Sequence, residues 1–326
     1  MKKLKISVVI FGAFIGLFAI LLSAKLIFAP KRTLSWGFQS IDTMKYSRDL
    51  SREKLNDPTF DLIIDRQIKQ IADTGVTHVA IATPYDEEFL PILKRWTKYA
   101  RQYDLKIWFR GNFSGWEEWF GHKKITRADH LQMTEEFILK NGEIFEDGDI
   151  FTACPECENG GPGDPRFNGD AQGHRKFLTD GYELTKRAFV EIGKNVKSNY
   201  NSMNGDVAML IMDRATTTKL DGVVVVDHYV RDPEDLVSDI DKYAKMSGGK
   251  VVLGEFGAPI PDLHGEMSEV EQAEWLETTM NLLSRSENVI GMNYWVNVGG
   301  STQLWDGAGN ERAAVNILQK YYKANK

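Results

Sequence analysis

The sequence predicts an α/β fold, a (β/α)8 TIM barrel preceded by an N-terminal transmembrane or signal-anchor helix. Two observations predict the barrel: short β-branched or aromatic runs alternate with longer amphipathic runs, and this alternation occurs eight times after residue 31. The length of about 290 residues fits such a barrel with insertions. With 42% hydrophobic and 26% charged residues, the composition excludes a disordered or fibrous protein.

The N-terminus reads as a membrane-targeting segment. Three lysines within the first five residues precede an uncharged apolar run over residues 6–24, which is long enough to span a bilayer as a helix. The small residues expected before a signal-peptidase cut are poorly placed, so an uncleaved anchor is favoured over a cleaved signal. We therefore expect a membrane segment over residues 1–30 and an extracytoplasmic catalytic domain over residues 31–326, which is secreted if the segment is cleaved.

The candidate strands are short runs with few charges inside them. They are residues 34–39, 77–83, 105–111, 149–155, 206–212, 222–228, 250–256 and 288–295. The candidate helices between and after them are residues 57–75, 90–104, 127–142, 174–194, 214–220, 233–249, 269–286 and 311–326, of which the run 214–220 is thin. An open doubly wound sheet is the alternative, but no GxGxxG turn follows the first strand.

In such a barrel the chemistry lies at the carboxyl ends of the strands and in the loops that follow. Aromatic, amide and charged side chains gather at these ends, and this mixture suits a sugar, because rings cover its C–H faces and polar groups bind its hydroxyls. The candidate substrate-binding residues are Trp36, Arg110, Asn112, Trp116, His228, Tyr229 and Trp295.

Two glutamates at strand ends form the candidate catalytic pair. Glu255 is the last charged residue of an otherwise apolar seventh run, and Glu156 follows the fourth run. Retaining glycoside hydrolysis uses two carboxyl groups about 5–5.5 Å apart, one as nucleophile and one as acid and base. Each glutamate alone also fits a salt bridge, for example with Arg110, but the pair on strands four and seven favours catalysis.

These segments resemble the clan A glycoside hydrolases. The resemblance rests on GEFG with Glu255, on DHYV with His228 and Tyr229, and on NYWV with Trp295; the segment WGFQ adds a weaker signal. It implies a (β/α)8 retaining enzyme with the acid/base glutamate at the end of strand four and the nucleophile at the end of strand seven. It also implies that Trp295 lies beneath the sugar at the cleavage point.

One position departs from that pattern. The family carries Asn before the acid/base glutamate, whereas Pro155 precedes Glu156 and Cys157 precedes Glu158. We therefore assign the acid/base to Glu156, because it directly follows the expected fourth strand, and keep Glu158 as the alternative. The contact that the family's Asn makes with the sugar 2-hydroxyl must come from another residue, or the substrate is unusual there.

No cofactor or metal is expected. Cys154 and Cys157 form a CxxC, but a zinc site needs further ligands at a recognisable spacing; a disulfide and two free thiols both remain open. The net charge of −6 offers no basic surface for nucleic acid. We expect a monomer whose partners are the membrane and a glycan.

The expected function is a retaining glycoside hydrolase acting on an extracytoplasmic oligo- or polysaccharide. In this mechanism Glu156 needs a raised pKa, whereas Glu255 must stay ionised with the help of Arg110 and Tyr229. The main alternative is a catalytically inactive barrel that binds glycan or a cell-wall partner, which the missing Asn supports. A metal-dependent hydrolase using His228 is a third hypothesis, although none of the six histidines forms an HxH pair.

Overall fold

The computed structural model describes residues 36–325, so the expected membrane segment over residues 1–30 lies outside the described part of the chain. Within the described part, no helix combines the length and the apolar character needed to cross a bilayer.

Eight strands alternate with helices along the described chain, as the sequence predicts. The strands are β1 (Phe38–Asp42), β2 (His78–Ile81), β3 (Lys106–Phe109), β4 (Ile150–Phe151), β5 (Ser202–Asn204), β6 (Val223–Asp227), β7 (Lys250–Phe256) and β8 (Val289–Tyr294). The α-helices are α2 (Met44–Ser47), α3 (Ser51–Lys54), α4 (Phe60–Asp73), α5 (Leu90–Gln102), α6 (Arg127–Lys140), α7 (Pro165–Asn168), α8 (Ala171–Glu191), α9 (Gly205–Ile211), α10 (Arg214–Lys219), α11 (Pro233–Ser247), α12 (Pro261–His264), α13 (Glu269–Leu283) and α14 (Ala313–Lys323), with short 3-10 turns at Glu87–Phe89, Trp119–Gly121 and Gly142–Ile144.

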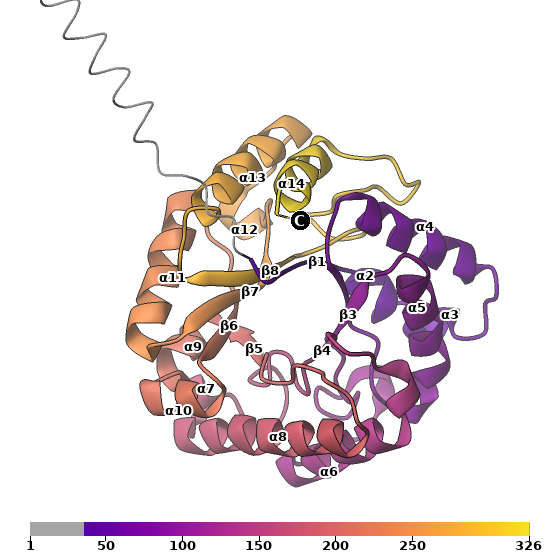
Figure 1. Ribbon diagram of the computed structural model, residues 1–326, viewed down its shortest axis with the longest axis vertical. Helices are drawn as coiled ribbons and strands as arrows, with labels where there is room; N and C mark the ends of the chain where they lie inside the picture. Colours follow the sequence, from indigo (N-terminus) through magenta and orange to yellow (C-terminus); the bar gives the residue numbers. More distant parts are fainter. Residues whose placement is uncertain (1–35, 326) are drawn as a thin grey trace, which may run out of the picture. The chain divides into compact units, whose positions relative to one another are not determined.

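All paired strands are parallel, and their order is β4-β3-β2-β1-β8-β7-β6-β5. The circle closes between β4 and the segment before β5, where Ile150 forms a parallel bridge with Lys197. Figure 1 shows the strands around the centre and the longer helices as an outer ring. The arrangement is a (β/α)8-like barrel, so the open doubly wound alternative is wrong.

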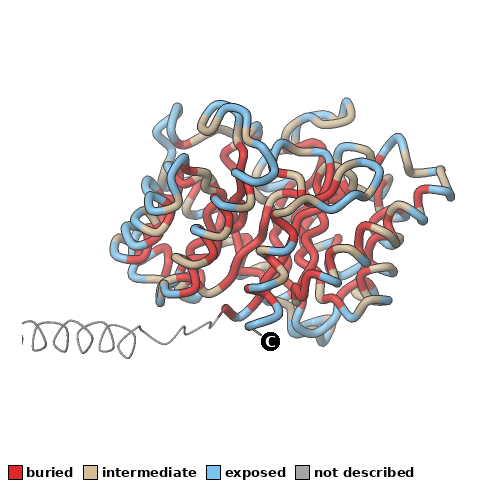
Figure 2. The backbone as a smooth tube through the Cα atoms, turned by 90° about the horizontal axis from the view of Figure 1, so that it is seen from above, coloured by how far each residue is buried: buried red, intermediate tan, exposed pale blue. Residues whose placement is uncertain are grey.

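The barrel has an inner and an outer core. The inner core is a small cluster inside the strands, made of Phe38, Ala80, Trp108, Ile150, Tyr200, Val223, Val225 and Val252. The outer core is larger and joins the other faces of the strands to the helices. The buried strands therefore lie in the middle of the molecule, with exposed backbone at its margins (Figure 2).

The fifth expected strand, residues 206–212, is wrong. This segment forms α9, in which Val207, Ala208 and Ile211 are buried at helical spacing. An uninterrupted apolar run fits a strand or a buried helix equally well, and here the helix forms. The actual fifth strand, Ser202–Asn204, has only three residues; Met203 packs in the outer core, and the Ser202 hydroxyl accepts a hydrogen bond from Arg110 inside the barrel.

The first and fourth strands differ from expectation in their ends. The first strand runs over Phe38–Asp42 rather than residues 34–39, so Trp36 precedes it. The fourth keeps only Ile150–Phe151 of the expected residues 149–155, because the chain beyond it leaves the ladder for an irregular loop. Both differences move side chains relative to the barrel mouth, the end of the barrel formed by the carboxyl ends of the strands.

Candidate active site

A buried polar layer lies across the barrel at the carboxyl ends of the strands, and Arg110 is its centre. Its guanidinium donates hydrogen bonds to Asp42 (2.9 Å) at the end of β1, to Asp227 (3.0 Å) in β6 and to the Ser202 hydroxyl (3.2 Å) in β5. It also donates to the backbone carbonyl of Gly254 in β7 (2.9 Å). The guanidinium carbon lies 5.1 Å from the centre of the Trp108 ring, so the layer lies against the inner core. One arginine thus ties together strands from around the barrel.

Glu255 is held by this layer. One carboxylate oxygen lies 3.1 Å from an Arg110 nitrogen, and the other accepts a hydrogen bond of 2.7 Å from the Tyr229 hydroxyl. Asn293 of β8 supports the same level by donating to Asp42 (3.1 Å) and to the carbonyl of Gly254 (2.9 Å). The Glu255 carboxylate therefore has a defined orientation at the floor of the mouth.

A β-bulge directs Glu255 into the barrel. Val226 pairs with Leu253, but the next residue, Asp227, pairs with Glu255, so Gly254 is the extra residue. Strict alternation from the inward Val252 would turn Glu255 outward, and the extra residue reverses that direction. A side chain at Gly254 would place its Cβ 2.1 Å from a carboxylate oxygen of Asp227, so only glycine fits there.

Burial raises the pKa of Glu255 to about 7. The Arg110 guanidinium and the Tyr229 hydrogen bond lower this pKa, while the negative charge of Glu156 raises it further. Burial also raises the pKa of Asp227 well above its ordinary value. The Arg110 guanidinium lowers this pKa, but the negative charges of the neighbouring carboxylates raise it. The two predicted partners, Arg110 and Tyr229, do favour the ionised form of Glu255, but burial favours the protonated form.

Glu156 lies on the loop after β4. Its backbone N–H donates to the carbonyl of Ser202 in β5 (2.8 Å), and its φ of 46° lies in the left-handed region. A disulfide joins Cys154 and Cys157 on either side of it, which resolves the alternative that the sequence left open. The negative charge of Glu156 raises the pKa of both Glu255 and Asp227.

Glu158, the alternative acid/base, is a buried residue of the same loop. One carboxylate oxygen accepts a hydrogen bond of 2.6 Å from the Asn204 backbone N–H, and the other is buried without a hydrogen-bond partner in the structure. Burial raises the pKa of Glu158 to about 7. Glu117, which sequence reasoning did not select, has its pKa raised to about 7 by burial as well, and Glu156 and Glu158 add to that rise.

The predicted substrate-binding residues His228, Tyr229 and Trp295 follow the strands β6 and β8. Trp295 is partly exposed after β8, with the Tyr229 ring edge-on at 6.2 Å and the Lys45 ammonium 5.7 Å from its ring centre. Its ring is therefore near Glu255 through Tyr229. His228 instead pairs with Asp239 of α11 at 2.8 Å, and its ring lies edge-on to the Tyr243 ring. Binding roles for these residues stay a prediction.

Three other predicted residues do not present an accessible side chain at the mouth. Trp36 precedes β1, at the amino end of the barrel, and its carbonyl accepts a hydrogen bond from Asn325 near the C-terminus. Its expected place after the first strand is wrong, because that strand begins two residues later. Asn112 and Trp116 do follow β3, but both are buried against the loop that carries Glu156. Trp116 therefore packs as core.

The residues that sequence reasoning missed are the layer beneath Glu255. The candidate residues named from the sequence do not include Asp42, Asp227, Ser202 or Asn293. The available signal was a polar residue at an inward position of an otherwise apolar strand, as in Asn293 of β8. For Ser202 this signal was absent, because the fifth strand itself was misplaced.

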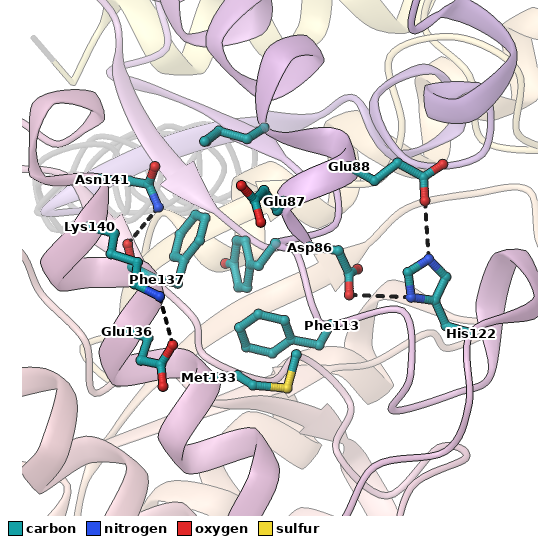
Figure 3. A pocket seen from close by; sticks show the side chains of 12 residues that line it. Asp86, Glu87, Glu88, Phe113, His122, Met133, Glu136, Phe137, Lys140 and Asn141 are labelled. Atoms are coloured by element: carbon teal, nitrogen blue, oxygen red, sulfur yellow. Dashed lines mark hydrogen bonds and ion pairs between the residues drawn. The ribbon is translucent and has the colours of Figure 1, made fainter.

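No group of three or more His, Cys, Asp or Glu side chains within residues 36–325 is placed to hold a metal ion. A separate cavity of about 670 Å³ lies between the loops after β2 and β3 and the helix α6 (Figure 3). On its rim His122 lies between Asp86 and Glu88, at 3.7 Å and 3.2 Å. Neither Glu255 nor Glu156 lines this cavity.

No protein-family model and no curated protein sequence matches the chain. Solved structures do match. The GH5-4 broad specificity endoglucanase from Clostridium longisporum has a TM-score of 0.59 at 15% identity, over 90% of this chain and 97% of its own. A variant of GH5_18 from Bifidobacterium longum subsp. longum, in complex with Manβ1-4GlcNAc, has a TM-score of 0.63 at 14% identity, over 88% of this chain and 78% of its own.

A beta-D-glucuronidase from Dictyoglomus thermophilum has a TM-score of 0.55 at 16% identity, over 89% of this chain and 50% of its own. The chain thus spans about half the length of the glucuronidases that it matches. At identities this low, the similarity shows only that the folds are alike. The fold is a (β/α)8-like barrel of the kind found in glycoside hydrolases that include GH5 enzymes of clan A, which confirms the predicted resemblance at the level of the fold.

Proposed function

We propose that the protein is a retaining glycoside hydrolase that acts on an oligo- or polysaccharide, with Glu255 as nucleophile and Glu156 as acid and base. The observation that carries this proposal is the placement of Glu255. A carboxylate at the end of β7 is buried in the barrel mouth, oriented by Arg110 and Tyr229, with Glu156 close enough to shift its pKa. A carboxylate desolvated in this way needs a function or a full set of partners.

In the first step Glu255 attacks the anomeric carbon of the sugar, and the glycosidic bond breaks. Glu156 gives its proton to the departing oxygen, so the leaving alcohol is neutral and a covalent glycosyl-enzyme forms. Tyr229 donates to one oxygen of Glu255 and Arg110 lies 3.1 Å from the other, so lone pairs on both oxygens stay free and one of them can reach the sugar. Trp295 would supply an aromatic face for the same sugar ring.

In the second step the ionised Glu156 takes a proton from water, and the oxygen of that water attacks the anomeric carbon. The bond to Glu255 breaks, the sugar leaves with its original configuration, and both carboxyl groups return to their starting states. This cycle requires an ionised Glu255, whose pKa is about 7 because of burial. Activity should therefore fall as the pH drops below neutral and Glu255 takes up a proton.

The proposed setting is extracytoplasmic, with the catalytic domain anchored through residues 1–30 or secreted after cleavage. Its support is the order of lysines and apolar residues at the N-terminus. The disulfide between Cys154 and Cys157 agrees with an oxidising compartment. A glycan is the substrate class that the mixture of carboxylates and aromatic rings suits, and the protein itself is proposed to act as a monomer.

The rival function is a barrel that binds glycan without cleaving it. The observation in its favour is Pro155, which stands where the family carries the Asn that contacts the substrate. A panel of oligosaccharides and polysaccharides incubated with the full-length chain separates the two, with Glu255→Gln as control. Hydrolysis by the parent but not by the variant supports the enzyme. Equal glycan binding by both, without hydrolysis by either, supports the binding protein.

A further inference from the structure

We propose that the Cys154–Cys157 disulfide is a positioning element that holds the Glu156 carboxyl group for acid catalysis. This inference rests on the proposed function, because it concerns the residue that would protonate the leaving group. It also gives a role to the CxxC motif, which the barrel fold does not require. The two sulfur atoms would not touch the substrate; they act through the backbone between them.

The ring closed by the disulfide contains only two further residues, Pro155 and Glu156. The Cα atoms of the two cysteines are 5.4 Å apart, and both side chains are almost fully buried. Between them Glu156 has a φ of 46°, a left-handed conformation that is unfavourable for a residue with a Cβ. Such a conformation persists where the surroundings impose it, and a small covalent ring does so.

Backbone hydrogen bonds fix the same residue from both sides. The Glu156 N–H donates to the carbonyl of Ser202 (2.8 Å), and its own carbonyl accepts from the N–H of Asn159 (2.8 Å). Ser202 also receives a hydrogen bond from Arg110 through its hydroxyl. The disulfide loop is thereby connected to the layer beneath Glu255, and the two catalytic candidates share one support.

Buried side chains of the loop after β3 hold the two cysteines in turn. The Trp116 indole N–H donates to the carbonyl of Cys157 (3.2 Å), and the Asn112 amide donates to the sulfur of Cys154 (3.6 Å). The Trp116 ring stacks on Phe177 of α8 with a centroid distance of 5.1 Å. These residues had been expected to bind substrate, and their contacts instead give the disulfide a rigid backing.

The fold needs such a device on this side of the barrel. The fourth strand has only two residues, so little sheet ladder reaches the loop that carries Glu156. The seventh strand continues through Glu255, so its ladder carries that residue into the mouth. General acid catalysis requires the proton donor within hydrogen-bond reach of the leaving oxygen, and a loose loop would lose that contact.

The test compares two aryl glycosides of a sugar that the glycan panel identifies. One carries phenol, which needs a proton to leave, and the other carries 2,4-dinitrophenol, which does not. In the Cys154→Ser/Cys157→Ser double variant of the full-length chain, kcat/KM for the phenyl glycoside should fall at least about tenfold, as expected from the usual contribution of a general acid. For the dinitrophenyl glycoside, kcat/KM should stay within about twofold.

A stability control separates positioning from folding. Val315→Ala removes buried methyl groups in α14, remote from the Glu156 loop, and should lower Tm while reducing kcat/KM for both glycosides by the same small factor. Alkylation under denaturing conditions, without reductant, should label neither cysteine of the isolated parent. An equal loss on both glycosides in the double variant, or two labelled cysteines in an active parent, would overturn the inference. A parent without any hydrolysis would instead overturn the proposed function.

Discussion

The two carboxylates of the proposed mechanism are held in different ways. Glu255 lies within a seven-residue strand and meets Arg110 and Tyr229 through side-chain contacts. Glu156 lies on an irregular loop after a two-residue strand, inside a disulfide ring. A strand that runs into the site sets the first side chain by its register, whereas the second depends on covalent and hydrogen-bonded support from other segments.

The strands of the barrel keep Glu255 rigid, whereas local bonds within the loop after β4 keep Glu156 rigid. The layer around Arg110 joins five strands, so a change in it affects the whole barrel mouth. The loop after β4 holds two carboxylates, Glu156 and Glu158, within three positions of each other. Variants on the two sides should therefore fail in distinguishable ways.

The largest loss of activity is expected when Glu255, the carboxylate on β7, is replaced. Glu255→Ala removes the nucleophile and should reduce kcat/KM by on the order of 10⁴-fold or more, the scale seen when a nucleophile is lost. Azide fits the space left by the carboxylate, so it should restore turnover of an activated glycoside and give a product of inverted anomeric configuration. Product configuration by NMR checks this. Full activity in Glu255→Ala would mean that the nucleophile lies elsewhere.

The next effect tests the loop side and decides between its two glutamates. Glu156→Ala should lose about 10²–10⁴-fold in kcat/KM with a leaving group that needs a proton, and little with an activated one. Azide should then give a product of retained configuration, because Glu255 is still present. Steady-state kinetics of Glu156→Ala and Glu158→Ala side by side measure this. If only Glu158→Ala shows the leaving-group dependence, Glu158 is the acid and base.

A smaller effect concerns stability. The ordinary pKa of Glu255 is 4.5, and burial raises it to about 7 in the folded state, so the folded state holds a proton that the unfolded state releases. Stability should fall as pH rises from 4.5 through 7, by about 3 kcal/mol. Glu255→Gln should therefore be more stable than the parent at pH 8 and not at pH 4.

Chemical denaturation of the parent and of Glu255→Gln at both pH values measures this difference. Glu183 in α8 is exposed, and Glu183→Gln serves as the matched control that should not change stability in a pH-dependent way. Equal stability of parent and Glu255→Gln at pH 8 would show that Arg110 and Tyr229 compensate fully for the burial of the carboxylate.

The smallest effect concerns the hydrogen bond from Tyr229. This bond lowers the pKa of Glu255, so Tyr229→Phe should raise it and move the acidic limb of the kcat/KM profile to higher pH, by about 1 unit. Tyr243→Phe is the control, since Tyr243 contacts His228 and not Glu255. A limb that moves to lower pH, or that moves equally in both variants, would contradict this assignment.

Much of this fold was predictable from the periodicity of the chain. The apolar runs of strands two, three, six, seven and eight lie where the sequence places them, because each is bounded by turns and followed by an amphipathic helix. Strand five was not predictable, because the polar side chain of Ser202 is buried through a hydrogen bond from Arg110, which lies in another part of the chain. Local composition carries no record of that partner.

The sequence by itself determined the barrel, the glutamate at the end of its seventh strand and the two glutamates after its fourth, because hydrophobic alternation and strand ends are local properties of the chain. Tertiary structure alone decided the direction of these side chains. Glu255 turns inward only because a bulge at Gly254 shifts the register against β6. Glu156 takes its position from a local disulfide and from a hydrogen bond to Ser202 of β5, and the second contact exists only once β5 lies beside the loop after β4.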